Sequence, residues 1–175
     1  MRSFIITALV LLLNSAISFA KSENADAIAI EGQIDAFIAS WNRHDWSDMA
    51  NYMAEDCDFV NVKGSHWKGR EEIQYAHQYF HRTVFPNTPM KKQSVTVRFI
   101  KPDVAIAHLV WQVGPDTVNP FPATPKTKPD GSYNDLATVV FIKRKGAWLI
   151  TAMENVVVDE ELALGDPIRL RNAAK

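Results

Sequence analysis

The hydrophobic residues of this 175-residue chain follow mainly a helical period in the first half and alternate with polar residues in the second. Ile30, Ile34 and Phe37 recur at the spacing of one buried helix face. Beyond residue 93, apolar residues such as Val95 and Val97 alternate with polar ones, which is typical of a half-buried strand. Helices followed by a run of strands predict an α+β domain with the helices on one face of an antiparallel sheet. A long sheet of this kind twists and curls, so helices laid in its hollow leave room for a pocket.

Three helices are expected in the first half. The first follows the polar residues 22–26 and ends near Arg43. Asp45 is expected to be the N-cap of a second, short helix, with Asp48 three residues later in the position of a capping box. The third begins near Gly69 and ends before Pro86. Its expected buried stripe is Ile73, Ala76, His77, Phe80 and Val84.

The strands are expected at residues 57–62, 65–68, 94–99, 104–113, 136–143 and 148–158. The last two form a hairpin that turns at Lys145 and Gly146. Residues 114–131 are rich in proline, and loops of this length are usually functional. We therefore expect this loop near the pocket mouth, and we expect residues 159–175 to be a peripheral tail.

Residues 1–20 have the pattern of a secretory signal peptide. Arg2 supplies a positive start, and an apolar run of about ten residues extends from Phe4 to Leu13. Small residues, Ser18 and Ala20, stand at the positions that a signal peptidase reads, so cleavage is predicted after Ala20, with the mature protein periplasmic or secreted. The apolar run is too short for a stable membrane span, so no membrane association is expected after cleavage. An uncleaved N-terminal anchor is the alternative.

Charge and cysteine content exclude two further classes. The net charge is −1 and there is no basic run, so the chain lacks the electrostatic footprint of a nucleic-acid-binding protein. Cys57 is the only cysteine, so no intramolecular disulfide can form and stability must come from packing. Cys57 begins an apolar strand and is expected to be a small buried hydrophobe.

The order of several short segments resembles one known family. Residues 41–45, 59–61 and 67–71 read WNRHD, FVN and WKGRE, and His77 and residues 102–105 (PDVA) follow, before His108 and Trp111. This succession resembles the SnoaL-like, or ketosteroid-isomerase-like, branch of the nuclear-transport-factor-2-like superfamily. Within it, the resemblance is strongest to the SgcJ/EcaC-like proteins found beside enediyne biosynthesis genes. It covers about residues 26–157, which is nearly the whole of the predicted mature domain.

The resemblance implies a cone-shaped, cystatin-like fold in which three helices pack on a strongly curved antiparallel sheet. It also implies a homodimer formed through the sheet. Members of the superfamily include isomerases, epoxide hydrolases, cyclases, dehydratases and non-catalytic binding domains, so the fold alone does not decide the chemistry. The SgcJ/EcaC-like proteins often carry His-Asn near the end of the last strand, whereas this chain has Glu154 and Asn155.

Three residues are candidates for catalysis. His77 lies in the buried stripe of the third helix, either as a core residue or facing a ligand. His108 shares one strand face with Gln112, and a polar pair among aliphatic residues favours this face as the pocket wall; the face of Trp111 is the alternative. Glu154 is either a buried carboxylate with a raised pKa, hence a general base, or an ordinary surface acid.

Five further residues are candidate ligand contacts. Asn61 lies among apolar neighbours and must be hydrogen-bonded to the backbone or to a ligand. Trp67 precedes the third helix and is expected to cap the open end of the cone, or else to fill the core. The remaining three candidates are Gln112, Asn155 and Tyr52.

No cofactor or metal is predicted. His77 and His81 form an i, i+4 pair, but the helix lacks a metallopeptidase glutamate and the sequence shows no third ligand. His81 is expected on the helix flank, near solvent. The chain has no glycine-rich dinucleotide loop, haem motif or nucleophile elbow. We therefore expect an exported protein that binds a small apolar or mixed-polarity molecule, and that acts by cofactor-independent acid-base chemistry as an isomerase, cyclase or dehydratase. A non-catalytic binding module of the same fold is the alternative.

Overall fold

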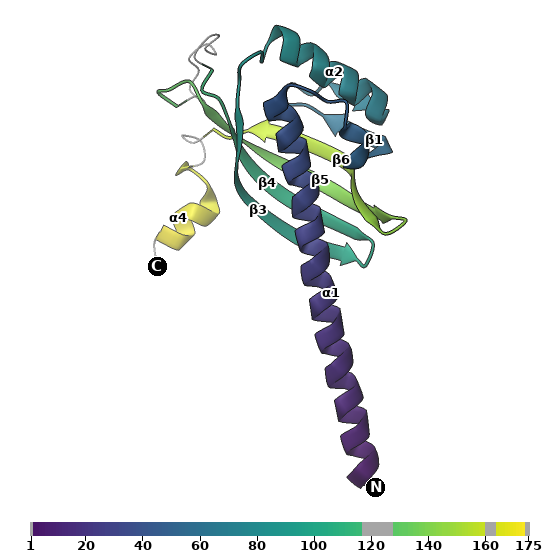
Figure 1. The fold of residues 1–175 in the computed structure, drawn as a ribbon. Helices are drawn as coiled ribbons and strands as arrows, with labels where there is room; N and C mark the ends of the chain where they lie inside the picture. Colours follow the sequence, from purple (N-terminus) through teal and green to yellow (C-terminus); the bar gives the residue numbers. More distant parts are fainter. Residues whose placement is uncertain (1, 117–127, 160–163, 174–175) are drawn as a thin grey trace.

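The computed structural model describes residues 2–116, 128–159 and 164–173, with side chains from residue 23 onward. Helix α1 (Arg2–Arg43) runs across one face of the sheet, and its first half extends beyond the sheet (Figure 1). Its buried side chains repeat at helical spacing, as the sequence predicts: Ile30, Ile34, Phe37, Ile38 and Trp41. Near the start of this buried stripe, the Asp26 carboxylate ties α1 to the sheet by accepting hydrogen bonds from Lys143 (2.6 Å) and Trp148 (2.9 Å).

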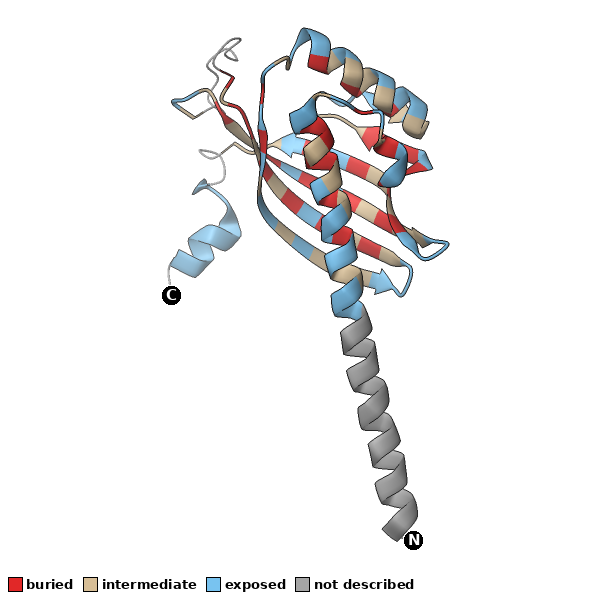
Figure 2. Cartoon of the chain, in the orientation of Figure 1, coloured by how far each residue is buried: buried red, intermediate tan, exposed pale blue. Residues whose placement is uncertain are grey.

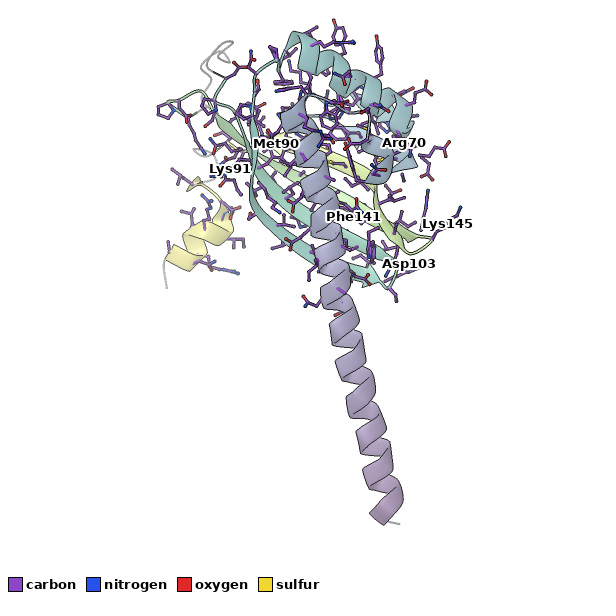
Figure 3. All side chains as sticks on the ribbon, in the orientation of Figure 1. Arg70, Met90, Lys91, Asp103, Phe141 and Lys145 are labelled. Carbon is purple, nitrogen blue, oxygen red and sulfur yellow. The ribbon has the colours of Figure 1, made fainter. Side chains whose placement is uncertain are left out.

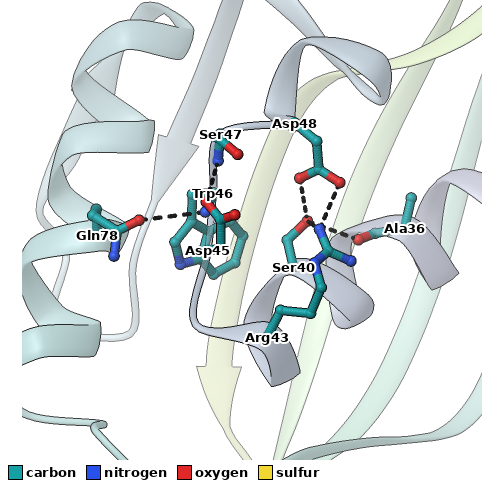
Figure 4. Close-up of polar contacts among 8 residues, drawn as sticks. All are labelled: Ala36, Ser40, Arg43, Asp45, Trp46, Ser47, Asp48 and Gln78. Atoms are coloured by element: carbon teal, nitrogen blue, oxygen red, sulfur yellow. Dashed lines mark hydrogen bonds and ion pairs between the residues drawn. The ribbon is translucent and has the colours of Figure 1, made fainter.

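The expected second helix is only a single 3₁₀ turn, η1 (Met49–Asn51). Asp45 does not cap it. Its carboxylate instead accepts a hydrogen bond from the amide of Ser47 in a local turn, at 3.0 Å. Asp48 precedes the 3₁₀ turn and binds Ser40 and Arg43 with its carboxylate, at 2.8 and 2.6 Å (Figure 4). Both carboxylates are therefore used in tertiary or local turn contacts, and neither caps a helix longer than this 3₁₀ turn.

Helix α2 (Gly69–Thr83) begins where the sequence predicts. Its buried residues are Ile73, His77 and His81, whereas Val84 is 39% exposed. The buried face is thus rotated from the expected stripe. His81, expected near solvent, is 3% exposed, so that expectation is wrong.

Six strands form one sheet in the order β2-β1-β6-β5-β4-β3. They are β1 (Met53–Val60), β2 (His66–Lys68), β3 (Met90–Lys101), β4 (Val104–Val113), β5 (Tyr133–Arg144) and β6 (Ala147–Val157). All neighbouring pairs are antiparallel except β1 and β6, which run parallel, so the sheet is mixed rather than purely antiparallel. The β5–β6 hairpin turns at Lys145 and Gly146, as predicted.

Buried and exposed residues alternate along the strands (Figure 2). We call the face toward α1 and α2 the inner face and the opposite one the outer face. The turns that contain Asp103 and Lys145 lie at one end of the sheet, and Met90 lies at the other (Figure 3). Cys57 is buried in the core, as predicted. The short helix α4 (Pro167–Ala173) is exposed along its whole length, in line with a peripheral tail.

Candidate active site

A cavity of about 180 Å³ lies between the helices and the inner face of the sheet. Its walls are mainly aromatic and aliphatic, and six polar side chains also line it. The apolar lining consists of Phe37, Trp41, Phe59, Val62, Trp67, Phe80, Val84, Phe85, Met90, Trp111, Val113 and Tyr133, and the polar lining of Asn61, Lys63, His77, His81, Asp135 and Asn155. A dry cavity of about 150 Å³ holds one benzene molecule, so this one fits a compound of one small ring.

Asp135 is the most unusual polar group of the cavity. It lies near the start of β5 on the inner face and is only 3% exposed. One carboxylate oxygen, Oδ2, accepts a hydrogen bond from the amide of Asn155 at 2.8 Å, and Oδ1 has no partner among the described residues. Burial raises the pKa of Asp135 to about 7, although Asn155 and the nearby Trp111 indole favour the charged form. This carboxyl therefore changes charge close to neutral pH.

The Trp111 indole N–H lies beside this carboxyl on the neighbouring strand, since Trp111 and Asp135 are cross-strand partners. The N–H is buried and lies close enough to the Asp135 carboxyl to lower its pKa, although the contact does not have the geometry of an ordinary hydrogen bond. The inner wall therefore combines one proton-exchanging carboxyl with two N–H donors, from Trp111 and Asn155.

A β-bulge in β6 brings Asn155 to the cavity. Val140 pairs with Ala152 and Phe141 pairs with Ile150, which leaves Thr151 without a partner in β5. Such an extra residue reverses the alternation of side chains beyond it. Asn155, 8% exposed, therefore faces inward, as predicted for a ligand contact.

The same bulge turns Glu154 outward. The expectation that Glu154 shares a face with Trp148 and Ile150 assumed unbroken alternation, and it is wrong. Glu154 is exposed, lies on the outer face and does not line the cavity. It is an ordinary surface acid.

His108 and Gln112 are likewise on the outer face. On β4 the buried residues are Ala105, Ala107, Leu109, Trp111 and Val113, so Trp111 faces the cavity and His108 is exposed. The Gln112 amide donates a hydrogen bond to the hydroxyl of Ser132 at 2.8 Å instead of facing the cavity. The inward placement of both residues is wrong. His108 and Glu154 do lie in one row, because each pairs with Thr138 of β5, but the row is on the solvent side.

His77 lines the cavity from the opposite wall, on α2. Its Nδ1–H donates to the backbone carbonyl of Ile73 at 2.8 Å, which leaves Nε2 as the unprotonated nitrogen. Phe59 and Trp67 lie against the ring, with centroid distances of 5.0 and 5.4 Å. Burial lowers the pKa of His77 to about 4, so the imidazole is neutral at physiological pH. His77 is therefore both packed in the core and presented to the cavity.

Two of the other candidate ligand contacts lie at the cavity. The side-chain oxygen of Asn61 accepts hydrogen bonds from the backbone amides of Lys63 and Ser65, at 3.0 and 2.9 Å. Of the two alternatives for Asn61, hydrogen bonding to the backbone is therefore the correct one for this oxygen. Trp67 stacks on Phe59 with a centroid distance of 5.5 Å and forms part of the wall.

Tyr52 does not contact the cavity. It is fully buried at the end of η1 and packs edge-on against Phe37, with the ring centroids 6.3 Å apart. Its side chain belongs to the core beside the cavity, so the expectation that it binds ligand is wrong.

The cavity lies beside both ends of the proline-rich loop, because Val113 and Tyr133 are lining residues. Residues 117–127 of that loop lie outside the described part of the chain, so its place at the pocket mouth stays a prediction. Within the described residues there is no group of three or more metal-binding side chains around His77 and His81.

Asp135 was not among the candidates from the sequence, and Trp111 was named only on the alternative inward face of its strand. Asp135 lies on the same strand face as the buried Ala137, Val139 and Phe141. If the strand had been expected to begin one residue earlier, the alternation of its side chains would have placed Asp135 inward. For Trp111, the choice between two strand faces could be made only from the three-dimensional packing.

The family sequence profile of the SnoaL-like domain matches residues 34–148. The chain belongs to the SnoaL-like family. This confirms the resemblance to the superfamily, and the specific likeness to SgcJ/EcaC-like proteins stays a prediction. The SnoaL-like fold generally binds small organic ligands, and its members include cofactor-independent isomerases and dehydratases. No curated protein matches this SnoaL-like chain by sequence.

Solved structures confirm the cystatin-like fold. An uncharacterised cystatin-like protein from Caulobacter vibrioides is 28% identical with a TM-score of 0.70, covering 83% of this chain and 97% of that one. A candidate scytalone dehydratase from Novosphingobium aromaticivorans is 16% identical with a TM-score of 0.64, covering 79% and 88%. The LinA-type3 hexachlorocyclohexane dehydrochlorinase from Novosphingobium barchaimii is 12% identical with a TM-score of 0.59, covering 78% and 88%. At these identities the last two show the fold alone.

Proposed function

We propose that this SnoaL-like protein is a cofactor-independent isomerase or dehydratase that acts on a small cyclic carbonyl compound. The observation that carries the proposal is the position of Asp135, a buried carboxyl with a pKa of about 7 in the wall of an aromatic cavity. A general base works best when its pKa is close to the working pH, and apolar burial is the usual way to raise a carboxyl to that range.

Three side chains divide the work in this proposal. The Asp135 carboxylate removes a proton from the carbon next to the substrate carbonyl, and the Trp111 indole N–H donates to the enolate oxygen that forms. The neutral Nε2 of His77 accepts a hydrogen bond from a substrate hydroxyl on the opposite wall and orients the ring.

The protonated Asp135 then returns the proton. Delivery to a different carbon moves the double bond and completes an isomerisation. Delivery to a β-hydroxyl breaks the C–O bond, releases water and leaves a C=C bond, which completes a dehydration. In both cases the protein ends in its starting protonation state. The protons and electrons of the reaction balance without a redox partner or a metal.

Deuterium incorporation tests this proposal. Cyclohexanone and 3-hydroxycyclohexanone fit the size of the cavity and carry acidic α-protons. We expect the wild-type protein in D₂O to exchange these protons faster than buffer, with a rate that rises through about pH 7 as Asp135 ionises. Asp135→Asn should lose this exchange by about 10²-fold or more. Glu154→Gln, an exposed carboxylate on the neighbouring strand, is the matched control and should retain it.

Two results would count against catalysis. Exchange that persists in a folded Asp135→Asn protein would remove Asp135 from the mechanism. Binding of both ketones without any exchange, measured by protein-observed NMR, would favour a non-catalytic binding module of the same fold.

Export is a second proposal. It is supported by the apolar run of residues 4–13 and by α1, whose first half extends beyond the sheet (Figure 1). Among the side chains described, from residue 23 onward, the buried stripe of α1 begins at Ile30. Within the residues whose side chains are described, no helix is long and apolar enough to cross a membrane. The N-terminal sequence of the protein recovered from cells tests this proposal: we expect Lys21 as the first residue, and Met1 would contradict cleavage.

A homodimer through the sheet is a third proposal. The outer face carries the half-buried Ile106, Val110 and Val140, and Val156 is 52% exposed. A second copy of the chain would bury these residues. Sedimentation equilibrium tests the proposal: we expect a dimer for the wild-type protein and a monomer for Val110→Lys, and a monomeric wild-type protein would contradict it.

A further inference from the structure

His81 and His44 form a direct contact that the proposed acid-base chemistry of Asp135 and His77 does not use. The two Nδ1 atoms are 2.7 Å apart, so one ring donates its Nδ1–H to the other. His81 lines the cavity from α2, and its Nε2 is buried without a hydrogen-bond partner among the described residues. His44 is only half-buried, at the end of α1. The pair thus joins the cavity wall to the protein surface.

The backbone holds His44 in an unusual position for this contact. His44 has a φ of 56°, in the left-handed region that few residues other than glycine, asparagine and aspartate adopt readily. Gln78 of α2 donates to the carbonyl of His44 at 3.1 Å, and its oxygen accepts from the amide of Trp46 at 3.4 Å (Figure 4 shows the second contact). These two hydrogen bonds of Gln78 hold the segment that carries His44 against α2, next to His81. Strained residues that are held in this way are concentrated at functional sites.

The surroundings of His81 favour a neutral ring. Trp41 and Trp46 pack edge-on against it, with centroids 4.5 and 5.3 Å away. Its titratable neighbours are His44, from the segment after α1, and His77, one turn earlier on α2. Burial, together with these two histidines, lowers the pKa of His81 to about 3. A proton can therefore pass through this ring only if another leaves it at the same time.

We infer that His81 and His44 form a proton relay between the cavity and solvent. In the starting state, Nδ1–H of His81 donates to Nδ1 of His44. Nε2 of His81 takes a proton from a water molecule or a substrate hydroxyl in the cavity, which is left deprotonated. The Nδ1 proton of His81 moves to Nδ1 of His44, and Nε2–H of His44 releases a proton to water. One proton enters and one leaves, both rings stay neutral, and the hydrogen bond between them persists with its direction reversed. The reverse sequence resets the pair.

The relay deepens the proposed function and rests on it, because it gives an acid-base site in a mainly aromatic wall a second route for protons to water, besides the cavity itself. It also makes a claim about the free protein that needs no substrate. The proton on the His81 ring should exchange with water much faster than its burial would allow.

NMR on protein with ¹⁵N-labelled histidine tests the relay. We expect saturation transfer from water to the His81 ring proton in the wild-type protein. His44→Asn should slow this exchange by on the order of 10²-fold, because asparagine accepts the left-handed φ but its amide cannot pass a proton along. His66→Asn, which removes an exposed histidine from β2, is the matched control and should leave the rate unchanged.

Equal exchange rates in the wild-type protein and a folded His44→Asn protein would overturn the relay. If His44→Asn does not fold, a measurement on the wild-type protein alone still tests the relay. A scalar coupling between the two Nδ1 nuclei across the hydrogen bond supports the relay, and absence of the coupling contradicts it. None of these readouts depends on turnover. A failed relay would therefore leave the deuterium test of Asp135 intact, and a failed deuterium test would leave the relay standing.

Discussion

The two faces of the sheet carry similar polar residues in opposite environments. On the inner face, Asp135 and Asn155 are buried in an aromatic wall and hydrogen-bonded to each other. On the outer face, His108 and Glu154 are exposed, although Glu154 directly precedes Asn155 in the chain. A shift of one residue along β6 therefore separates Asn155, which binds a buried carboxyl whose pKa is raised to about 7, from the exposed side chain of Glu154. The chemistry of this protein depends on which face a residue occupies more than on its type.

The sharpest test of the two faces is a pair of identical substitutions. Leu109 on the inner face of β4 is 1% exposed, and Leu136 on the outer face of β5 is 38% exposed. We expect Leu109→Ala to lower the free energy of unfolding by about 2–5 kcal/mol, because it removes buried methyl groups and leaves a cavity. In the monomeric Val110→Lys background, where no second copy covers the outer face, Leu136→Ala should cost less than about 1 kcal/mol. Urea denaturation at one fixed protein concentration measures both. Equal losses would show that the outer face is as buried as the inner one.

Asp135→Asn should change the pH dependence of stability. The native Asp135 binds its proton more tightly than the unfolded chain does, so between about pH 4 and pH 7 the native state holds the extra proton. Ionisation therefore destabilises the native protein as the pH rises through this window, by up to about 4 kcal/mol at pH 8. The asparagine variant lacks this loss. We expect its stability relative to the wild-type protein to increase from pH 4 to pH 8.

The measurement is urea denaturation of both proteins at each pH. Taking the difference between them removes the opposite contributions of His77 and His81, which are the same in both chains. A difference that does not vary with pH would contradict the raised pKa of Asp135. Glu154→Gln is the control and should show no such trend, since Glu154 is exposed.

Much of the fold was predictable because it depends on local patterns. The buried stripe of α1, the start of α2 at Gly69 and the β5–β6 hairpin all follow from spacing, propensity and turn chemistry in adjacent residues. The parallel pairing of β1 with β6 was not predictable in this way. It joins residues far apart in the chain, such as Val60 and Glu154, and no local pattern records it.

The site was harder to predict than the fold because its polar residues depend on small shifts of register. The unpaired Thr151 exchanges the faces of Glu154 and Asn155, and alternation alone cannot reveal such a bulge. His77 was identified correctly as a buried residue of the helix, because its helical stripe fixes its direction, but the sequence could not decide between the core and the cavity. Asp135 was missed because the strand begins earlier than its most apolar residues.

His77→Phe tests whether the histidine on the helix side contributes to folding through its ring or through its charge. The native ring is neutral with a pKa of about 4, whereas the unfolded ring binds a proton below about pH 6.5. The wild-type protein should therefore lose up to about 3 kcal/mol from this group as the pH falls from 6.5 to 4. Phenylalanine fills similar space without titrating, so we expect a folded variant that lacks this loss.

Denaturation of His77→Phe and wild-type protein at pH 7 and pH 4.5 measures the effect. The variant should also bind 3-hydroxycyclohexanone more weakly, because the acceptor for the substrate hydroxyl is gone. An unfolded variant at pH 7 would show instead that the hydrogen bond from His77 to Ile73 is essential for the helix.

The smallest effects are expected from the polar row on the outer face. His108→Gln and Glu154→Gln each change an exposed side chain, so each should alter the free energy of unfolding by less than about 0.5 kcal/mol. Both residues pair with Thr138, and on the other side His108 pairs with Thr96 and Glu154 with Val60. Neither should change deuterium incorporation into cyclohexanone, since neither residue lines the cavity. Parallel denaturation and exchange measurements on both variants check this expectation. A loss of exchange in either one would mean that a second copy of the chain brings the outer face into the chemistry, and that the inner wall with Asp135 is not sufficient by itself.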